Sequence, residues 1–215
     1  MRPALLMLLI LLLAPAAGAE DCIVIDDFAK ARVGEFPPDW KVRKETGKSV
    51  YTVQQEAGLR FLHATSQRVA SQAAKQFEWD VNRYPVLAWS WRPMEFPEGA
   101  DEKDGKNDSV LSVYFMVPYS SIRGPKAVKY IWSERVPIGT RLESNGGLTQ
   151  VRVLESGTEK RGQWIEERVK MRDDWLAYFK EKDVPKPAGI AVLTDSDDTG
   201  SSAQGDYAKF RACAE

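Results

Sequence analysis

The stretch YAKFRACAE, residues 207–215, ends the chain with a strand-like run that contains Cys213. The only other cysteine, Cys22, lies in a similar run near the start, DCIVIDDF, residues 21–28. In an oxidising compartment two cysteines usually pair, and closing so long a loop stabilises a fold by roughly 4–5 kcal/mol in the entropy model. We therefore predict a Cys22–Cys213 disulfide that holds the first strand beside the last, as a jelly-roll sandwich provides. The alternative is a reactive thiol.

The first residues have the pattern of a secretory signal peptide. Arg2 precedes an apolar run, ALLMLLILLLAP, and the small residues Ala17, Gly18 and Ala19 follow at the positions that signal peptidase requires. The run has about half of the roughly 20 apolar residues that a membrane span needs. We therefore predict cleavage after Ala19, no membrane span, and a periplasmic or secreted protein.

The charge of the chain is balanced, with 30 basic and 31 acidic residues. This balance gives no attraction to the phosphates of nucleic acid or to anionic lipid. A chain of this length fits one large all-β domain better than two small ones, because sandwiches of about 200 residues fold as one unit. We predict a signal peptide over residues 1–19, a single β-sandwich domain over residues 20–215, and no nucleic-acid partner.

β-branched and aromatic residues recur at period two in short runs that Gly, Pro, Asn and Asp separate, a pattern typical of antiparallel β-structure. One segment differs: in DDWLAYFKEKD, residues 173–183, Trp175, Leu176 and Phe179 share one face of a short helix that Asp173 would cap. A tight turn is expected at Asn145–Gly147. The predicted strands lie near residues 22–28, 50–54, 59–64, 70–79, 86–92, 110–117, 128–132, 149–154, 164–169, 189–193 and 207–211.

Tryptophans mark a candidate binding face. Trp89 and Trp91 in VLAWSWRP, residues 86–93, are two residues apart and therefore lie on one face of a strand. That face belongs either to the core or to a binding platform, since aromatic rings also stack on sugars. Trp132 in KYIWSE has the same two interpretations. Trp91 and Trp132 are therefore candidate ligand-binding residues.

The segment TDSDDTGSSAQGDY, residues 194–207, gathers acidic residues in a loop. Asp195, Asp197 and Asp206 partly match the spacing of an EF-hand, but a strand precedes the loop where an EF-hand requires a helix. A structural calcium site of another kind, made by these three residues, remains one interpretation. The others are a ligand site that includes Asp195, Asp197 and Asp198, and hydrogen bonds to loop amides that only hold the turn.

Catalytic motifs are absent from the sequence. There is no G-x-S-x-G elbow, and a single histidine, His63, excludes zinc sites built from several imidazoles and favours a structural role. The acidic loop GADEKDGKND, residues 99–108, is interpreted as a solvated connection, with Asp108 at the entrance of a strand as a further ligand-binding candidate.

Several blocks resemble, in order, those of the bacterial domain of unknown function 3047 family: YPVLAWSWRP, KYIWSERVPIGT, VRVLESGTEKRGQWIEERV and GIAVLTDSDDTGSSAQGDYAKF. The T-D-x-D-[ND]-T-G block after a strand is the most specific. Ser112 stands where many relatives carry arginine, Ser133 where aspartate is expected, and Asp198 where asparagine is usual. The resemblance implies an exported protein with a jelly-roll sandwich similar to galactose-binding and other carbohydrate-binding modules, without an established activity.

Two classes of function follow. We favour a noncatalytic module that binds a glycan or another small polar ligand of the cell envelope, because carboxylates and aromatic faces can hold hydroxyl-bearing ligands without a general acid. A glycosidase would instead need two carboxylates about 5–10 Å apart, one with a raised pKa, and no spacing in the sequence selects such a pair. A structural or assembly protein of the envelope is the third alternative. No cofactor other than the calcium ion considered above is expected.

Overall fold

The structure, a computed structural model, describes residues 20–215. The predicted signal peptide and its cleavage after Ala19 lie outside the described residues. None of the helices in the described part is long and apolar enough to cross a membrane.

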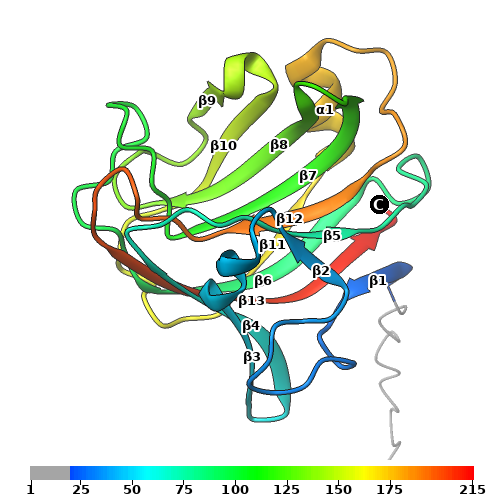
Figure 1. Ribbon diagram of the computed structural model, residues 1–215. Coiled ribbons are helices and arrows are strands. Elements are labelled where there is room, and N and C mark those ends of the chain that lie inside the picture. Colours follow the sequence, from blue (N-terminus) through cyan, green and yellow to red (C-terminus); the bar gives the residue numbers. More distant parts are fainter. Residues whose placement is uncertain (1–19) are drawn as a thin grey trace, which may run out of the picture.

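Thirteen strands form two sheets, which we call sheet A and sheet B (Figure 1). Sheet A has the order β11-β6-β13-β4-β3, and β1 (Cys22–Asp26) pairs with β13 beside this path. The bounds of the ordered strands are Ile165–Val169 for β11, Val86–Glu95 for β6, Ser202–Cys213 for β13, Leu59–Gln67 for β4 and Tyr51–Glu56 for β3.

Sheet B has the order β2-β5-β12-β7-β8-β10-β9. Its strands span Trp40–Val42 (β2), Ala73–Gln76 (β5), Gly189–Leu193 (β12), Leu111–Ser120 (β7), Gly124–Ser133 (β8), Thr149–Ser156 (β10) and Arg141–Ser144 (β9). The strands pair antiparallel, as predicted, except that β10 runs parallel to β8. The hairpin of β9 and β10 reverses the chain once more before β10 reaches β8.

The two sheets face each other across one large apolar core, which confirms the predicted jelly-roll sandwich. Trp89 of sheet A and Tyr130 of sheet B meet there with ring centroids 5.7 Å apart. The helix α1 (Met171–Phe179) adds Trp175, which is fully buried against Phe115. Two short 3-10 helices complete the fold, η1 (Glu45–Val50) and η2 (Asn145–Gly147), the second at the predicted tight turn.

The helix begins earlier than the sequence indicates. Its N-cap residue is Lys170 and makes no side-chain cap, so the predicted cap at Asp173 is wrong. Asp173 and Asp174 instead lie in the first turn, where negative side chains offset the positive end of the helix dipole.

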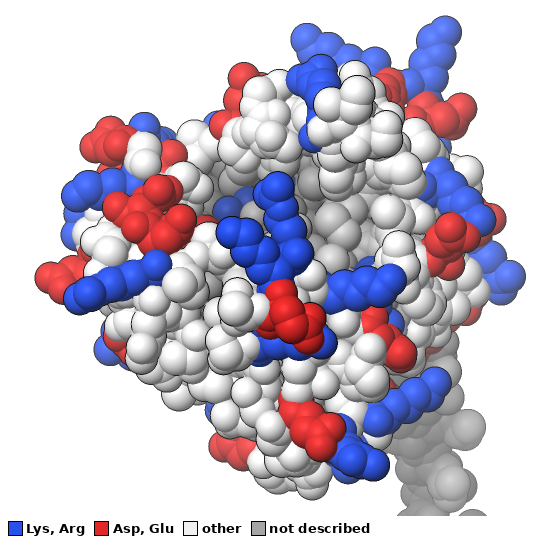
Figure 2. Space-filling view, viewed as in Figure 1, with Lys and Arg blue, Asp and Glu red and all other residues white. Residues whose placement is uncertain are grey.

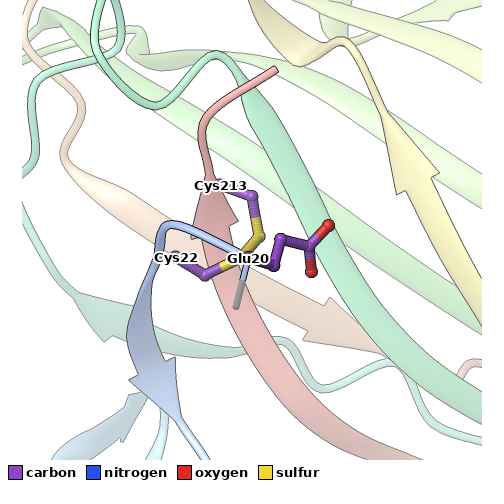
Figure 3. Close-up of side chains that lie close together, drawn as sticks. All are labelled: Glu20, Cys22 and Cys213. Carbon is purple, nitrogen blue, oxygen red and sulfur yellow. A yellow bond between two sulfur atoms is a disulfide. The ribbon is translucent and has the colours of Figure 1, made fainter. Parts of the chain in front are cut away.

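A disulfide joins the ends of the described chain. Cys22 and Cys213 are paired neighbours in β1 and β13, and their sulfur atoms are bonded, as predicted (Figure 3). Glu20 lies beside them, and its carboxylate pairs with Arg168 at 2.5 Å and with Arg211 at 3.8 Å. Because both sulfurs are in the disulfide, this cluster offers no thiolate to a metal.

Candidate functional site

The outer face of sheet B, which points away from the core, is the floor of a hollow. A separate small cluster of Tyr114, Ala127, Ala191 and Leu193 forms part of this face. In the view of Figure 2 the surface is hollowed over the region where Figure 1 places β12, β7 and β8, and basic side chains project over its edge. Strand alternation puts the side chains of this floor opposite those that fill the core.

Lys129 is the charged residue of this floor. It pairs across the strands with Tyr114, and its ammonium lies 5.5 Å from the centre of that ring. The residue is only 6% exposed, and within the described chain its ammonium has no carboxylate oxygen within 4.0 Å. Burial lowers the pKa of Lys129, but the neighbouring Tyr114, Asp195 and Glu102 raise it more, so the side chain stays charged.

Asp195 follows β12 and approaches the same floor. Its Oδ1 accepts a hydrogen bond of 2.8 Å from the backbone N–H of Ser109, and the residue is 4% exposed. Burial raises the pKa of Asp195 to about 6; Lys129 and the Ser109 N–H oppose the increase, whereas Asp108 and Asp197 add to it. A carboxyl group with this pKa is partly protonated near neutral pH and can both accept and donate hydrogen bonds.

Asp108 fixes the loop that carries the other acids. Its carboxylate accepts hydrogen bonds from the backbone N–H groups of Asp198 and Thr199, at 3.2 and 2.8 Å, and from the Thr199 hydroxyl at 2.7 Å. The carboxylate of Asp198 accepts a further bond of 2.6 Å from the amide of Asn107. N–H and hydroxyl donors of the loop that follows β12, rather than an arginine, therefore surround Asp108.

Three acids come together at this loop. Asp108, Asp195 and Asp197 each contribute one carboxylate oxygen, and the three oxygens lie within 4.8 Å of one another. Hard cations such as calcium bind sites of clustered carboxylates, so these three residues are the ones that could hold such an ion. Burial, together with Asp198 and Asp108, also raises the pKa of Asp197. Calcium binding here stays a prediction.

The predicted metal set is wrong in one member. Asp206 lies on β13, where its carboxylate accepts a bond from Arg92 Nε and contacts His63 Nδ1, both at 2.7 Å. These two neighbours take the place that a cation would need. His63 also meets the Thr65 hydroxyl at 3.1 Å, so the histidine belongs to a polar row on the outer face of sheet A.

The two candidate tryptophans are core residues, and the prediction that they bind a ligand is corrected. Trp91 and Trp132 are both 0% exposed, with ring centroids 5.7 Å apart. The indole N–H of Trp91 donates to Glu167 Oε1, and that of Trp132 donates to the carbonyl of Gly157. Period two correctly placed Trp89 and Trp91 on one face, but it does not say which face turns inward.

Sequence reasoning missed Lys129, Tyr114 and Glu102. The loop that was interpreted as a solvated connection in fact places Glu102 against the sheet, where its carboxylate accepts bonds from the hydroxyls of Ser109 and Ser133 at 3.0 and 2.6 Å. The sequence signal for Lys129 was its place inside the apolar run AVKYIW. There it lies on the opposite face of the strand from Tyr130 and Trp132.

Comparisons with known proteins identify a family. The family described as "Protein of unknown function (DUF3047)" matches residues 38–211. No curated protein matches the sequence.

Two solved structures are similar in fold. The carbohydrate recognition domain of Emp47p is 8% identical, with 88% of this chain and 94% of that chain covered and a TM-score of 0.45. The xyloglucanase domain of NopAA from Sinorhizobium fredii, solved with cellobiose, is 9% identical, with 82% and 96% covered and a TM-score of 0.39. At these identities the likeness concerns the fold alone.

Proposed function

We propose that this chain, which belongs to the DUF3047 family of proteins of unknown function, is a noncatalytic module that binds a glycan on the outer face of sheet B. The observation that carries the proposal is Lys129, a buried ammonium without an ion pair in the described chain. Tyr114, Asp195 and Glu102 keep this ammonium charged despite its burial, and titratable groups perturbed in this way cluster at functional sites.

The groups around Lys129 suit a ligand with several hydroxyls. The ammonium offers donors, the carboxyl group of Asp195 offers an acceptor, and the ring of Tyr114 offers a flat apolar surface. A sugar presents the same combination, because each hydroxyl both donates and accepts while the faces of its ring are apolar.

A cavity of about 700 Å³ opens beside this floor. Leu193 of the floor lines it together with the segments 43–50 and 69–72, which include Arg43, Lys44 and Gln72. This volume lies within the range of small-molecule sites, roughly 300–1,000 Å³. A cavity of this volume is large enough for a sugar unit.

The compartment fits a ligand of the cell envelope. The Cys22–Cys213 disulfide is typical of proteins that reside outside the reducing cytosol. With the predicted signal peptide, it supports the proposal that the protein is periplasmic or secreted.

Binding of the described chain, residues 20–215, to a panel of immobilised neutral glycans tests the proposal. Lys129→Met keeps the length of the side chain and removes the charge, so we expect affinity to fall roughly tenfold or more, the value of one charge-assisted hydrogen bond. Lys186→Met, at an exposed ion pair with Glu78, is the matched control and should bind as the wild type does. Unchanged glycan binding by a folded Lys129→Met variant would contradict the proposed site.

A glycosidase is the second candidate, because Asp195 has the raised pKa that a general acid needs. The two oxygens of Glu102 already accept serine hydroxyls, which favours a fixed hydrogen-bonding role over that of a catalytic partner. Incubation with the same glycans in solution decides between the two functions. Release of reducing ends that Asp195→Asn abolishes would establish hydrolysis, and binding without release supports the module.

A further inference from the structure

A second cavity lies on the other side of the loop that carries Asp195. It has a volume of about 980 Å³ and opens at the end of sheet A, where the segments around residues 68, 96, 161 and 201 meet at the left of Figure 1. Its lining residues are Gln67, Arg68, Met94, Glu95, Phe96, Glu98, Arg161, Gly200, Ser201 and Ser202.

Arg68 is held in place at one wall of this cavity. Its backbone N–H donates to the carbonyl of Ser201 and to the hydroxyl of Ser196, both at 3.0 Å, and its Nε donates to the carbonyl of Gly200 at 3.1 Å. Its φ of 55° lies in the left-handed region, which costs a non-glycine residue free energy and is tolerated where neighbouring contacts impose it. The remaining guanidinium nitrogens have no carboxylate within 4.0 Å in the described chain.

Arg161 enters the same cavity from the loop before β11. Its guanidinium lies 5.9 Å from the centre of the Phe96 ring, and it too forms no ion pair with a described residue. Two arginines without carboxylate partners therefore line one space. Planar guanidinium groups bind carboxylates with two parallel hydrogen bonds, which lysines cannot do.

The acidic residues of the cavity do not neutralise these arginines. Glu95 uses one carboxylate oxygen to accept the Ser202 hydroxyl and the other to accept the Gln204 amide at 2.9 Å. Glu98 is exposed and forms no ion pair with a described residue. Met94 and Phe96 supply an apolar surface next to the charges, and Met94 is 39% exposed.

We propose that this cavity binds the carboxylate of an acidic sugar, a uronic acid within an oligosaccharide. Arg68 and Arg161 take the carboxylate, the side chains of Gln67 and Ser201 face the hydroxyls, and Met94 with Phe96 contacts a face of the sugar ring. The site is independent of Lys129, which lies on the outer face of sheet B.

Calorimetric titration with a trisaccharide of galacturonic acid tests the proposal, and the methyl ester of the same trisaccharide is the neutral control ligand. We expect the acid to bind and the ester to bind roughly tenfold or more weakly. Arg68→Gln and Arg161→Gln should each weaken binding of the acid by a similar factor. Arg83→Gln is the matched control, because Arg83 also lies over an aromatic ring, that of Tyr84, away from the cavity.

Two further variants keep the outcome decisive. Arg68→Gly accepts the left-handed backbone without strain, so it replaces Arg68→Gln if the glutamine variant does not fold. Lys186→Met, at the exposed ion pair with Glu78, should bind the acid as the wild type does. Equal binding of acid and ester, or undiminished binding by folded variants of both Arg68 and Arg161, would overturn the proposal.

Discussion

The environment of Asp195 disfavours the ionised form of its carboxyl group. Burial and the acids Asp108 and Asp197 raise its pKa to about 6, although Lys129 and the Ser109 N–H oppose them. Lys129 keeps its charge on the same floor without an ion pair. Titratable groups perturbed in this way cluster at functional sites, which is why the proposed glycan site is placed here.

This pKa makes stability depend on pH in a defined direction. The folded pKa of about 6 lies above the ordinary value of 3.8, so the folded state binds the proton more tightly. The resulting stabilisation is fully present below about pH 4 and is lost as the pH rises through about 6. We expect Asp195→Asn to gain stability relative to the wild type between pH 4 and 7, on the order of 2 kcal/mol.

Urea unfolding at several pH values measures this difference. Asp104→Asn, in an exposed part of the acidic loop, is the control and should show no such trend. A constant difference between wild type and Asp195→Asn across the pH range would contradict the raised pKa. Calcium held by Asp108, Asp195 and Asp197 would keep Asp195 ionised and remove this pH trend. A melting temperature that is the same with and without chelator would contradict the calcium prediction.

The sequence predicted this site in part. Asp108, Asp195 and Asp198 could be selected as site candidates. Aspartates next to Thr, Asn and Gly indicate loops in which side chains hydrogen-bond to the backbone. Lys129 and Glu102 could not be selected from the sequence. A lysine in a strand and an acid in a charged loop give the same sequence pattern whether they face solvent or face each other. Only the pairing of β7 with β8 brings Lys129 beside Tyr114.

At the scale of the element, residue patterns were sufficient wherever a strand was long. All eleven predicted strands overlap strands of the structure, whereas β2 and β9, with three and four residues, were missed. A run of three or four residues shows little period of its own, and β5, with four, was found only inside the longer predicted run 70–79. Alternation could not decide which face of β6 turns inward, since its burial pattern is continuous over six residues and Trp91 is as buried as Leu87. That choice depends on the sheet packed opposite.

The carboxylate of Asp174 adds a polar link between the helix α1 and sheet B. Asp174 accepts the Tyr130 hydroxyl at 3.0 Å and a guanidinium nitrogen of Arg152 at 2.9 Å. Asp173 lies beside it in the same helical turn but is exposed. The two acids therefore share the interaction with the helix dipole and differ in their tertiary contacts.

Replacing each of these acids by asparagine separates the two effects. We expect Asp174→Asn to lower the free energy of unfolding by about 1–3 kcal/mol, because the ion pair with Arg152 is lost. Asp173→Asn should change it by only about 0.5 kcal/mol. Chemical denaturation followed by circular dichroism gives both values, and equal losses in the two variants would show that Asp174 acts through the helix dipole alone.

At the scale of the whole molecule, β13 is the strand that unites sheet A. It pairs with β6, β4 and β1, so the last strand of the chain lies at the centre of the sheet. Its N-terminal end adjoins the loop of Asp195 and the cavity of Arg68, and its C-terminal end carries the disulfide (Figure 1). The cysteine spacing allowed this closure to be predicted, whereas the parallel pairing of β8 and β10 had no signal in the sequence.

The disulfide should stabilise the fold without being required to form it. Cys22 and Cys213 are already neighbours in the β1–β13 ladder, and the bond between them closes a loop over a sequence separation of 191 residues. The double variant Cys22→Ser, Cys213→Ser should therefore retain the far-ultraviolet spectrum of the wild type but lose about 2–5 kcal/mol of unfolding free energy. Urea unfolding with and without reductant measures the loss, and reductant should leave the double variant unchanged. Equal stability of oxidised and reduced wild type would mean that the backbone ladder alone holds the two ends, because the disulfide acts mainly by restricting the unfolded chain.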